Sequence, residues 1–234
     1  MRPIPLVNIQ WVFVDSGTFQ MGSTNYASTK PTHSVKVSRF YMSATEITFE
    51  QYDKFCDVTN AKKPDDNGWG RGKMPVVNVS WNDAVAFCRW MSDQAGKTVR
   101  LPTEAEYEYA ARGGSKGGGY AFSGSSEPGG VAWYADNSGG KPHVVGSKAP
   151  NELGLYDMSG NVWEWCEDWY HQSYDKAPSD GSIWNVEDRY NPYRVLRGGS
   201  ANGASYCSQV VFRFWLAPFF RDKVIGFRCV EEAK

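Results

Sequence analysis

Alternating apolar and polar residues near the N-terminus predict short β-strands. Residues 11–14 read Trp-Val-Phe-Val, an Asp-Ser-Gly turn follows, and residues 18–21 read Thr-Phe-Gln-Met. Two such runs around a turn are typical of a β-hairpin. Residues 33–41, with the sequence HSVKVSRFY, alternate again and predict one further strand.

Three helices are predicted by capping pairs that precede apolar residues at helical spacing. In each pair a hydroxyl side chain stands three positions before Gln, Asp or Glu, so each side chain can hydrogen-bond the other residue's backbone N–H. Gly96 and Gly113 are expected to end the second and third helices. The pairs are Thr48 with Gln51, Ser80 with Asp83, and Thr103 with Glu106.

Beyond residue 114 the sequence shows almost no helical pattern. Glycine-rich stretches at 113–119 and 126–130 lie between aromatic segments and are interpreted as loops within one domain. A few helices near the N-terminus, followed by short strands and long irregular loops, favour an α+β fold. We therefore expect one domain spanning residues 1–234.

The composition shows an excess of aromatic residues and argues against a nucleic-acid ligand. Aromatic residues make up 15% of the chain, including 10 Trp, and there are 24 Gly. Bulky rings can supply the burial that irregular loops otherwise lack. The net charge is −1, which argues against a nucleic-acid ligand because such binding relies on clustered basic charge. We expect no signal peptide within this chain, because the first ten residues lack a long apolar run.

Seven collinear segments resemble the formylglycine-generating enzyme (sulfatase-modifying factor) family. The resemblance extends from about residue 11 to residue 230 and implies a C-type-lectin-like fold with little regular secondary structure. Fold alone does not give function, so the sites need their own assessment. The segments are residues 13–22, 45–48, 75–81, 100–113, 154–165, 197–200 and 225–228.

The resemblance also implies where an oxidase of this family would carry its two catalytic cysteines. These lie three and eight positions after the Ser of the Arg-Gly-Gly-Ser motif, where two thiolates can hold Cu(I). Counting from Ser200, the positions here hold Gly203 and Ser208, and Cys207 lies one position away. We therefore expect no copper and no enzymatic activity.

Two groups of polar residues remain as candidates for other chemistry. The resemblance implies a calcium site at Asp157, Gly160, Val162 and Glu164, two carboxylates with two main-chain carbonyls between them. Calcium prefers such oxygen ligands, and the alternative is that Asp157 and Glu164 only cap turns. Glu167 and Asp168 lie close to Glu164; an acid–base pair is possible there, but a structural role is favoured.

The segment 201–224 departs from the family pattern and is similar to the variable segment of proteins diversified by bacterial retroelements. Six of its 24 residues are aromatic, without a helical or strand period. Large rings beside small residues suit a binding surface; the alternative is that rings such as Phe212 and Phe219 belong to the core. The candidate ligand-binding residues are Ala201, Asn202, Gly203, Ala204, Ser205, Tyr206, Phe212, Phe214, Trp215, Leu216, Phe219, Phe220, Asp222 and Lys223.

These observations predict a non-catalytic protein that displays a hypervariable surface to a ligand, expected to be another protein. The expected location is the bacterial cell surface or the extracellular space, with the targeting or anchoring segment absent from this chain. Two alternatives remain. One is a formylglycine-generating oxidase with an altered metal site. The other is a calcium-dependent lectin-like module, which would need a Gln/Asn-Pro-Asp type motif that the sequence lacks.

Overall fold

Short strands in three small sheets make up the framework within residues 7–187 and 192–233, which the computed structural model describes. One sheet has the order β1-β4-β10-β5, a second pairs β2 with β3, and a third has the order β8-β7-β6-β9. All pairings are antiparallel except the one between β6 and β9. The strands are β1 (Trp11–Val14), β2 (Gly17–Met21), β3 (His33–Val37), β4 (Phe40–Ser43), β5 (Val99–Arg100), β6 (Trp163–Trp169), β7 (Arg194–Arg197), β8 (Phe214–Leu216), β9 (Ile225–Gly226) and β10 (Val230–Glu232).

The N-terminal strands exist where predicted, but they do not pair as predicted. β1 pairs with β4 and β2 pairs with β3, so the expected hairpin over residues 11–21 does not form. The predicted strand over 33–41 is likewise divided in two. Ser38 and Arg39 are both exposed, which shifts the alternation by one residue. Because such a shift turns side chains to the other face, the chain passes from one sheet to the other there.

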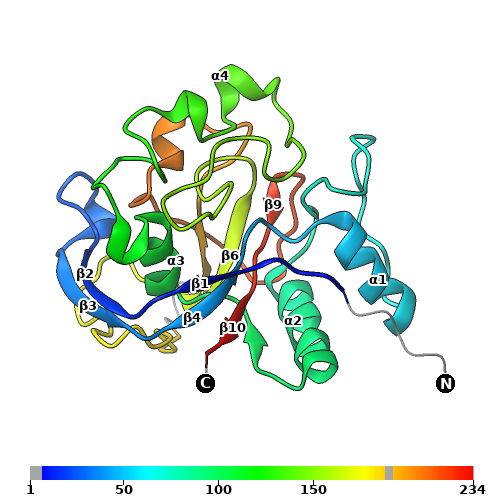
Figure 1. Ribbon diagram of the computed structural model, residues 1–234, viewed down its shortest axis with the longest axis horizontal. Coiled ribbons are helices and arrows are strands. Elements are labelled where there is room, and N and C mark those ends of the chain that lie inside the picture. Colours follow the sequence, from blue (N-terminus) through cyan, green and yellow to red (C-terminus); the bar gives the residue numbers. More distant parts are fainter. Residues whose placement is uncertain (1–6, 188–191, 234) are drawn as a thin grey trace.

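The three predicted capping boxes are all present, and each begins a helix. Both hydrogen bonds of the box form at Thr48, Ser80 and Thr103, and Gly96 adopts φ 62° after the second helix. α1 and α2 lie on one side of the central strands and α3 on the other (Figure 1). The helices are α1 (Phe49–Thr59), α2 (Trp81–Ala95), α3 (Glu104–Ala111) and α4 (Ala135–Ser138), with short 3-10 turns at Ala27–Thr29, Gly114–Lys116, Pro128–Gly130 and Ser205–Ser208.

Two clusters of buried apolar side chains support the framework. The first joins α1 and α2 to β6 and β9, where Phe87 packs against Tyr52 and Phe227. The second lies around α3 and the strands β2, β3 and β4. The many short strands, few helices and long irregular segments confirm the predicted α+β class. Among the described residues, no helix has the length and apolar character needed to cross a membrane.

Helix α3 is buried along its whole length, including three glutamates. All eight of its residues are buried, so it lacks the polar outer face of an ordinary surface helix. A buried carboxylate is costly unless it is paired. Arg213, inside the segment 201–224, pairs with Glu104, and Arg197, just before the segment, pairs with Glu108.

Candidate ligand-binding surface

The segment 201–224 connects β7 to β9 and contributes the edge strand β8. It is drawn in orange shades in Figure 1, with its 3-10 turn close to α4. The backbone N–H of Ala135 in α4 donates to the carbonyl of Gly203 at 2.9 Å. The segment is therefore fixed to the scaffold at several points and is not a free loop.

Exposed large apolar side chains are concentrated in this segment. Of nine such residues in the described part of the chain, four lie within these 24 positions. Side chains of this size usually contribute to the core, and their clustering on a surface marks an interaction site. The four are Tyr206 (54% exposed), Trp215 (37%), Phe219 (70%) and Phe220 (42%). The alternative that Phe219 belongs to the core is wrong.

The other two rings of the segment, Phe212 and Phe214, connect two of the exposed rings to Trp163 in a continuous row of aromatic contacts. Phe212 and Phe214 are half-buried and pack against the first apolar cluster, as does Leu216. Phe212, Phe214 and Leu216 therefore pack against the scaffold and are still partly exposed, so their contact with a ligand stays a prediction. The ring contacts run Tyr206–Phe212 (5.7 Å between centroids), Phe212–Trp163 (6.1 Å), Trp163–Phe214 (5.2 Å), Phe214–Trp215 (5.6 Å) and Trp215–Tyr170 (4.3 Å).

The small and charged candidate residues also include both buried and exposed side chains. Ala201 is fully buried, its N–H donates to the carbonyl of Asn161, and its carbonyl accepts from Ser138 Oγ. Its side chain is therefore not part of the surface, contrary to the prediction. Asn202, Ala204 and Lys223 are exposed, and Gly203, Ser205 and Asp222 are partly exposed.

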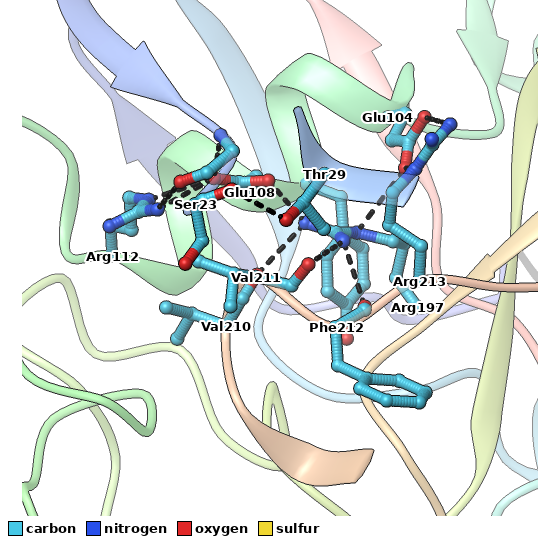
Figure 2. A network of polar contacts seen from close by, with 12 residues as sticks. Ser23, Thr29, Glu104, Glu108, Arg112, Arg197, Val210, Val211, Phe212 and Arg213 are labelled. Carbon is cyan, nitrogen blue, oxygen red and sulfur yellow. Dashed lines mark hydrogen bonds and ion pairs between the residues drawn. The ribbon is translucent and has the colours of Figure 1, made fainter. Parts of the chain in front are cut away.

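Arg197 holds the middle of the segment through backbone atoms (Figure 2). Its side chain has no exposure, and its Nη1 donates to the carbonyls of Val211 (3.1 Å) and Phe212 (2.8 Å). Its Nη2 donates to the carbonyl of Val210 (2.8 Å) and to Glu108 Oε2 (2.6 Å). One buried guanidinium thus fixes three consecutive peptide groups.

Arg213 fixes the segment from within. Its Nε and Nη2 donate to Glu104 Oε1 (2.6 Å) and Oε2 (2.8 Å), and its Nη1 donates to the carbonyls of Ser28 (2.6 Å) and His171 (3.0 Å). Burial would raise the pKa of Glu104, but the charges of Arg213 and Arg197 outweigh it and lower the pKa. Glu104 is therefore ionised, and the buried pair is fully charged.

Sequence reasoning did not find Glu104 and Glu108 as anchors. The signal was present: glutamates on α3 stand at positions where a helix needs apolar residues. The sequence left an acid–base role and a structural role open for Asp168. Its carboxylate accepts hydrogen bonds from the backbone N–H of Glu104 (2.8 Å) and of Trp184 (2.9 Å). That arrangement is structural, as favoured.

The positions of the two expected thiolates, 203 and 208, hold no thiol, and the nearby cysteine is Cys207. A Cβ added at Gly203 would stand 3.8 Å from the Cβ of Cys207. Ser208 is fully buried, and its Oγ lacks a hydrogen-bond partner. Within the described residues the close pair of thiols is elsewhere: Cys88 Sγ lies 3.5 Å from Cys229 Sγ.

The predicted calcium ligands fit an ion only in part. Both oxygens of Glu164 are occupied, because Arg228 donates to each (2.7 and 3.0 Å) and Tyr107 donates to Oε1 (2.9 Å). Asp157 Oδ2 accepts from the N–H of Gly146 at 2.6 Å. No group of three or more His, Cys, Asp or Glu side chains in the described part of the chain is arranged to hold a metal.

A third carboxylate nearby was not predicted. Glu46 is fully buried, and no N–H or hydroxyl group of a described residue donates to its oxygens. Burial and the charges of Asp157 and Glu164 raise its pKa. The contact between the Glu46 and Asp157 side chains fits one proton shared by the two carboxyl groups, which relieves this repulsion.

Sequence comparison places these features in a family. The signature of the sulfatase-modifying factor enzyme 1-like domain matches residues 6–233. The chain belongs to this family. The formylglycine-generating enzyme of Streptomyces coelicolor is 43% identical over 185 residues, covering 70% of this chain but only 54% of that enzyme. The chaperone protein LppX of Paenibacillus barcinonensis is 30% identical over 238 residues, covering 80% of this chain and 77% of that protein.

Solved structures confirm the fold of this sulfatase-modifying factor family member. PvdO from Pseudomonas aeruginosa superposes with a TM-score of 0.84 at 31% identity, covering 95% of this chain and 94% of PvdO. Treponema denticola variable protein 1 superposes with a TM-score of 0.79 at 28% identity, covering 98% and 97%. The predicted family and its C-type-lectin-like fold are thus confirmed, as is the resemblance to a variable protein. The chain spans about half the length of the Streptomyces enzyme that it matches.

Proposed function

We propose that this family member is a non-catalytic ligand-binding domain that displays residues 202–223 on a fixed scaffold. One observation carries the proposal: exposed aromatic side chains project from a segment whose backbone is held by buried Arg197 and Arg213. Tyr, Trp and Phe offer large contact areas at low cost in side-chain entropy, and small neighbours such as Ala204 allow close approach. Such a surface suits a protein ligand.

The likeness to Treponema denticola variable protein 1 supports the second element of the proposal, which is variation. We infer that the exposed positions are rewritten by a retroelement, while the anchors stay constant. Presentation on a bacterial surface would follow from such a role. A reverse-transcriptase gene and a near-copy of the codons for residues 197–228 beside the gene are the expected genomic signature, and their absence would count against diversification.

A pair of display libraries tests the division between surface and scaffold. The first library randomises exposed positions, namely 202, 204, 206, 215, 219, 220 and 223. Substitutions at exposed sites usually change stability by only about 0.5 kcal/mol, so most members should fold and selection on a folded test protein should yield specific binders.

The matched library randomises buried positions of the same segment, namely 201, 208, 210, 213 and 224. Most of its members should fail to fold, because buried truncations typically cost about 2–5 kcal/mol. Equal tolerance in both libraries, or no binders from a well-folded first library, would contradict the proposal.

The identity to the Streptomyces enzyme favours one rival, a formylglycine-generating oxidase. We propose that this chain does not perform that reaction, because Gly203 and Ser208 cannot supply thiolates for copper. Incubation with Cu(I), oxygen and a cysteine-containing sulfatase peptide should leave the cysteine unchanged. The formylglycine-generating enzyme of Streptomyces coelicolor, assayed in parallel, is the positive control. Catalytic turnover by the natural chain would refute this assignment.

A further inference from the structure

A cavity of about 690 Å3 lies where α1 and α2 meet the C-terminal part of the segment 201–224. Its volume is within the range of binding sites in proteins, about 300–1,000 Å3. Tyr52 and Phe55 from α1 and Val79 before α2 provide apolar walls. These walls are fixed by the core, because the Phe55 ring packs against Phe87 in the first apolar cluster (5.7 Å between centroids).

Three consecutive residues of the segment join it to this cavity. Arg221 is itself a lining residue. The carbonyl of Asp222 accepts a hydrogen bond from the backbone N–H of Asn78, another lining residue, at 2.9 Å. Lys223 Nζ lies 5.9 Å from the centre of the Trp69 ring, which belongs to the loop after α1. The cavity therefore adjoins the proposed display surface.

The charged residues that line the cavity balance one another. Arg221 donates to both oxygens of Asp83, at 2.8 and 3.0 Å. Lys63 is paired at the surface with an aspartate of α1 (2.7 Å). The remaining charged lining residues, Lys62 and Asp65, have opposite signs. A charged occupant would lose its hydration without gaining a dedicated partner, so the cavity favours a neutral, apolar one.

We propose that the cavity receives an apolar side chain from a protruding loop of the protein that binds the segment 201–224. The inference rests on the proposed display function and adds the kind of partner, a folded protein with an exposed Trp or Phe at a loop tip. Exposed Phe219 and Phe220 directly precede Arg221 in the chain, so a protein that covers these two rings lies beside the cavity.

The cavity would be a constant part of a surface whose other positions vary. None of its lining residues is among the positions proposed to be rewritten, and Arg221 is the one lining residue from the segment. Aromatic side chains that fill a desolvated pocket often dominate the energy of a protein interface, while the surrounding contacts exclude water. One inserted ring could thus hold the partner while the variable residues select it.

The first test uses 3-methylindole, the analogue of a Trp side chain, as a probe on the isotope-labelled whole chain. Saturable chemical-shift changes are expected at the amides of α1, α2 and residues 61–65. Propionamide, the analogue of a Gln side chain, should bind at least about tenfold more weakly, because apolar walls do not replace its hydrogen bonds to water.

Matched variants locate the binding of the probe. Ala86→Trp places a ring in the cavity from an exposed position on α2 and should abolish binding of 3-methylindole. Arg89→Trp, at an exposed position of the same helix that does not line the cavity, should leave it unchanged. Both variants should melt close to the natural chain, because substitutions at exposed sites usually have small effects on stability.

The second test uses binders of lysozyme selected from the library in which the exposed positions of the segment are randomised. Adding Ala86→Trp should weaken most of these binders at least about tenfold, the effect expected for loss of a buried aromatic anchor. Adding Arg89→Trp should not. Removing the inserted ring from lysozyme should weaken binding to the natural cavity, with little further effect in the Ala86→Trp background.

The two tests fail in different ways. No saturable binding of 3-methylindole, equal binding of propionamide, or unchanged binding of 3-methylindole in Ala86→Trp would overturn the proposal. Lysozyme binders that tolerate Ala86→Trp as well as Arg89→Trp would overturn it too, while leaving the display function standing. A well-folded library without any lysozyme binder would contradict the display function and the proposed partner together, and binding of 3-methylindole would then indicate a small-molecule site.

Discussion

Replacing Arg213 with Met should destabilise the whole domain although the residue lies within the proposed variable segment. The substitution leaves Glu104 ionised and 3% exposed, with the Tyr174 hydroxyl (3.1 Å) and the more distant Arg197 Nε (3.8 Å) as its remaining side-chain partners. It also removes donors from the carbonyls of Ser28 and His171.

The size of the effect follows from these contacts. Breaking a buried ion pair by removing one partner typically costs about 3–5 kcal/mol. A domain of this kind has a total stability of about 5–15 kcal/mol, so the variant should unfold at a much lower urea concentration. Adding Glu104→Gln should recover a large part of the loss, because the second substitution removes the uncompensated charge.

Urea unfolding monitored by tryptophan fluorescence and by far-UV circular dichroism provides the measurement. Arg89→Met on the exposed face of α2 is the matched control and should change the free energy of unfolding by about 0.5 kcal/mol or less. A loss below about 1 kcal/mol for Arg213→Met would refute the anchoring role. A double variant no more stable than the single one would show that the charge of Glu104 is not the cause.

Three further predictions concern other buried groups. Burial and the charge of Glu104 raise the pKa of Asp168 to about 7. The protonated carboxyl therefore contributes its full stabilisation below about pH 4, and this contribution is lost as the pH rises toward 7. Asp168→Asn should flatten the dependence of the free energy of unfolding on pH over that range. If calcium binds near Asp157, chelation should lower the melting temperature, with stabilisation of about 2.7 kcal/mol at a hundredfold excess over Kd, and Asp157→Ala should abolish that response. Mild oxidation with glutathione disulfide should join Cys88 to Cys229, whose Sγ atoms lie 3.5 Å apart; maleimide labelling of the denatured protein should then detect three of the five thiols, and labelling of all five would contradict it.

Local signals in the sequence predicted local structure well. The capping pairs at Thr48, Ser80 and Thr103 fixed the starts of three helices because the hydrogen bonds involved span only three residues. Strand pairing was harder to predict from the sequence. β1 and β2 follow each other in sequence, yet each pairs with a strand more than ten residues away. Two consecutive exposed residues, Ser38 and Arg39, were the readable sign that the chain changes sheets there.

The candidate surface was predicted as a segment but not residue by residue. Exposure of Tyr206 and Phe219 and burial of Ala201 depend on which side of the segment faces Trp163 and the α4 turn. An irregular segment has no periodic pattern from which the side that faces the scaffold could be predicted. The anchoring glutamates were missed for a related reason: the partners of Glu104 lie about a hundred residues away in sequence.

The carbonyl contacts of Arg197 have a consequence for how this domain can evolve. A guanidinium that binds peptide oxygens at positions 210–212 does not read the side chains there, since every amino acid, proline included, carries that oxygen. The hydrogen bonds of Arg197 to these carbonyls therefore do not depend on which side chains occupy positions 210–212. Mutations at exposed neighbouring positions can alter what the surface recognises while these backbone contacts are kept, whereas buried Val210 must still suit the core.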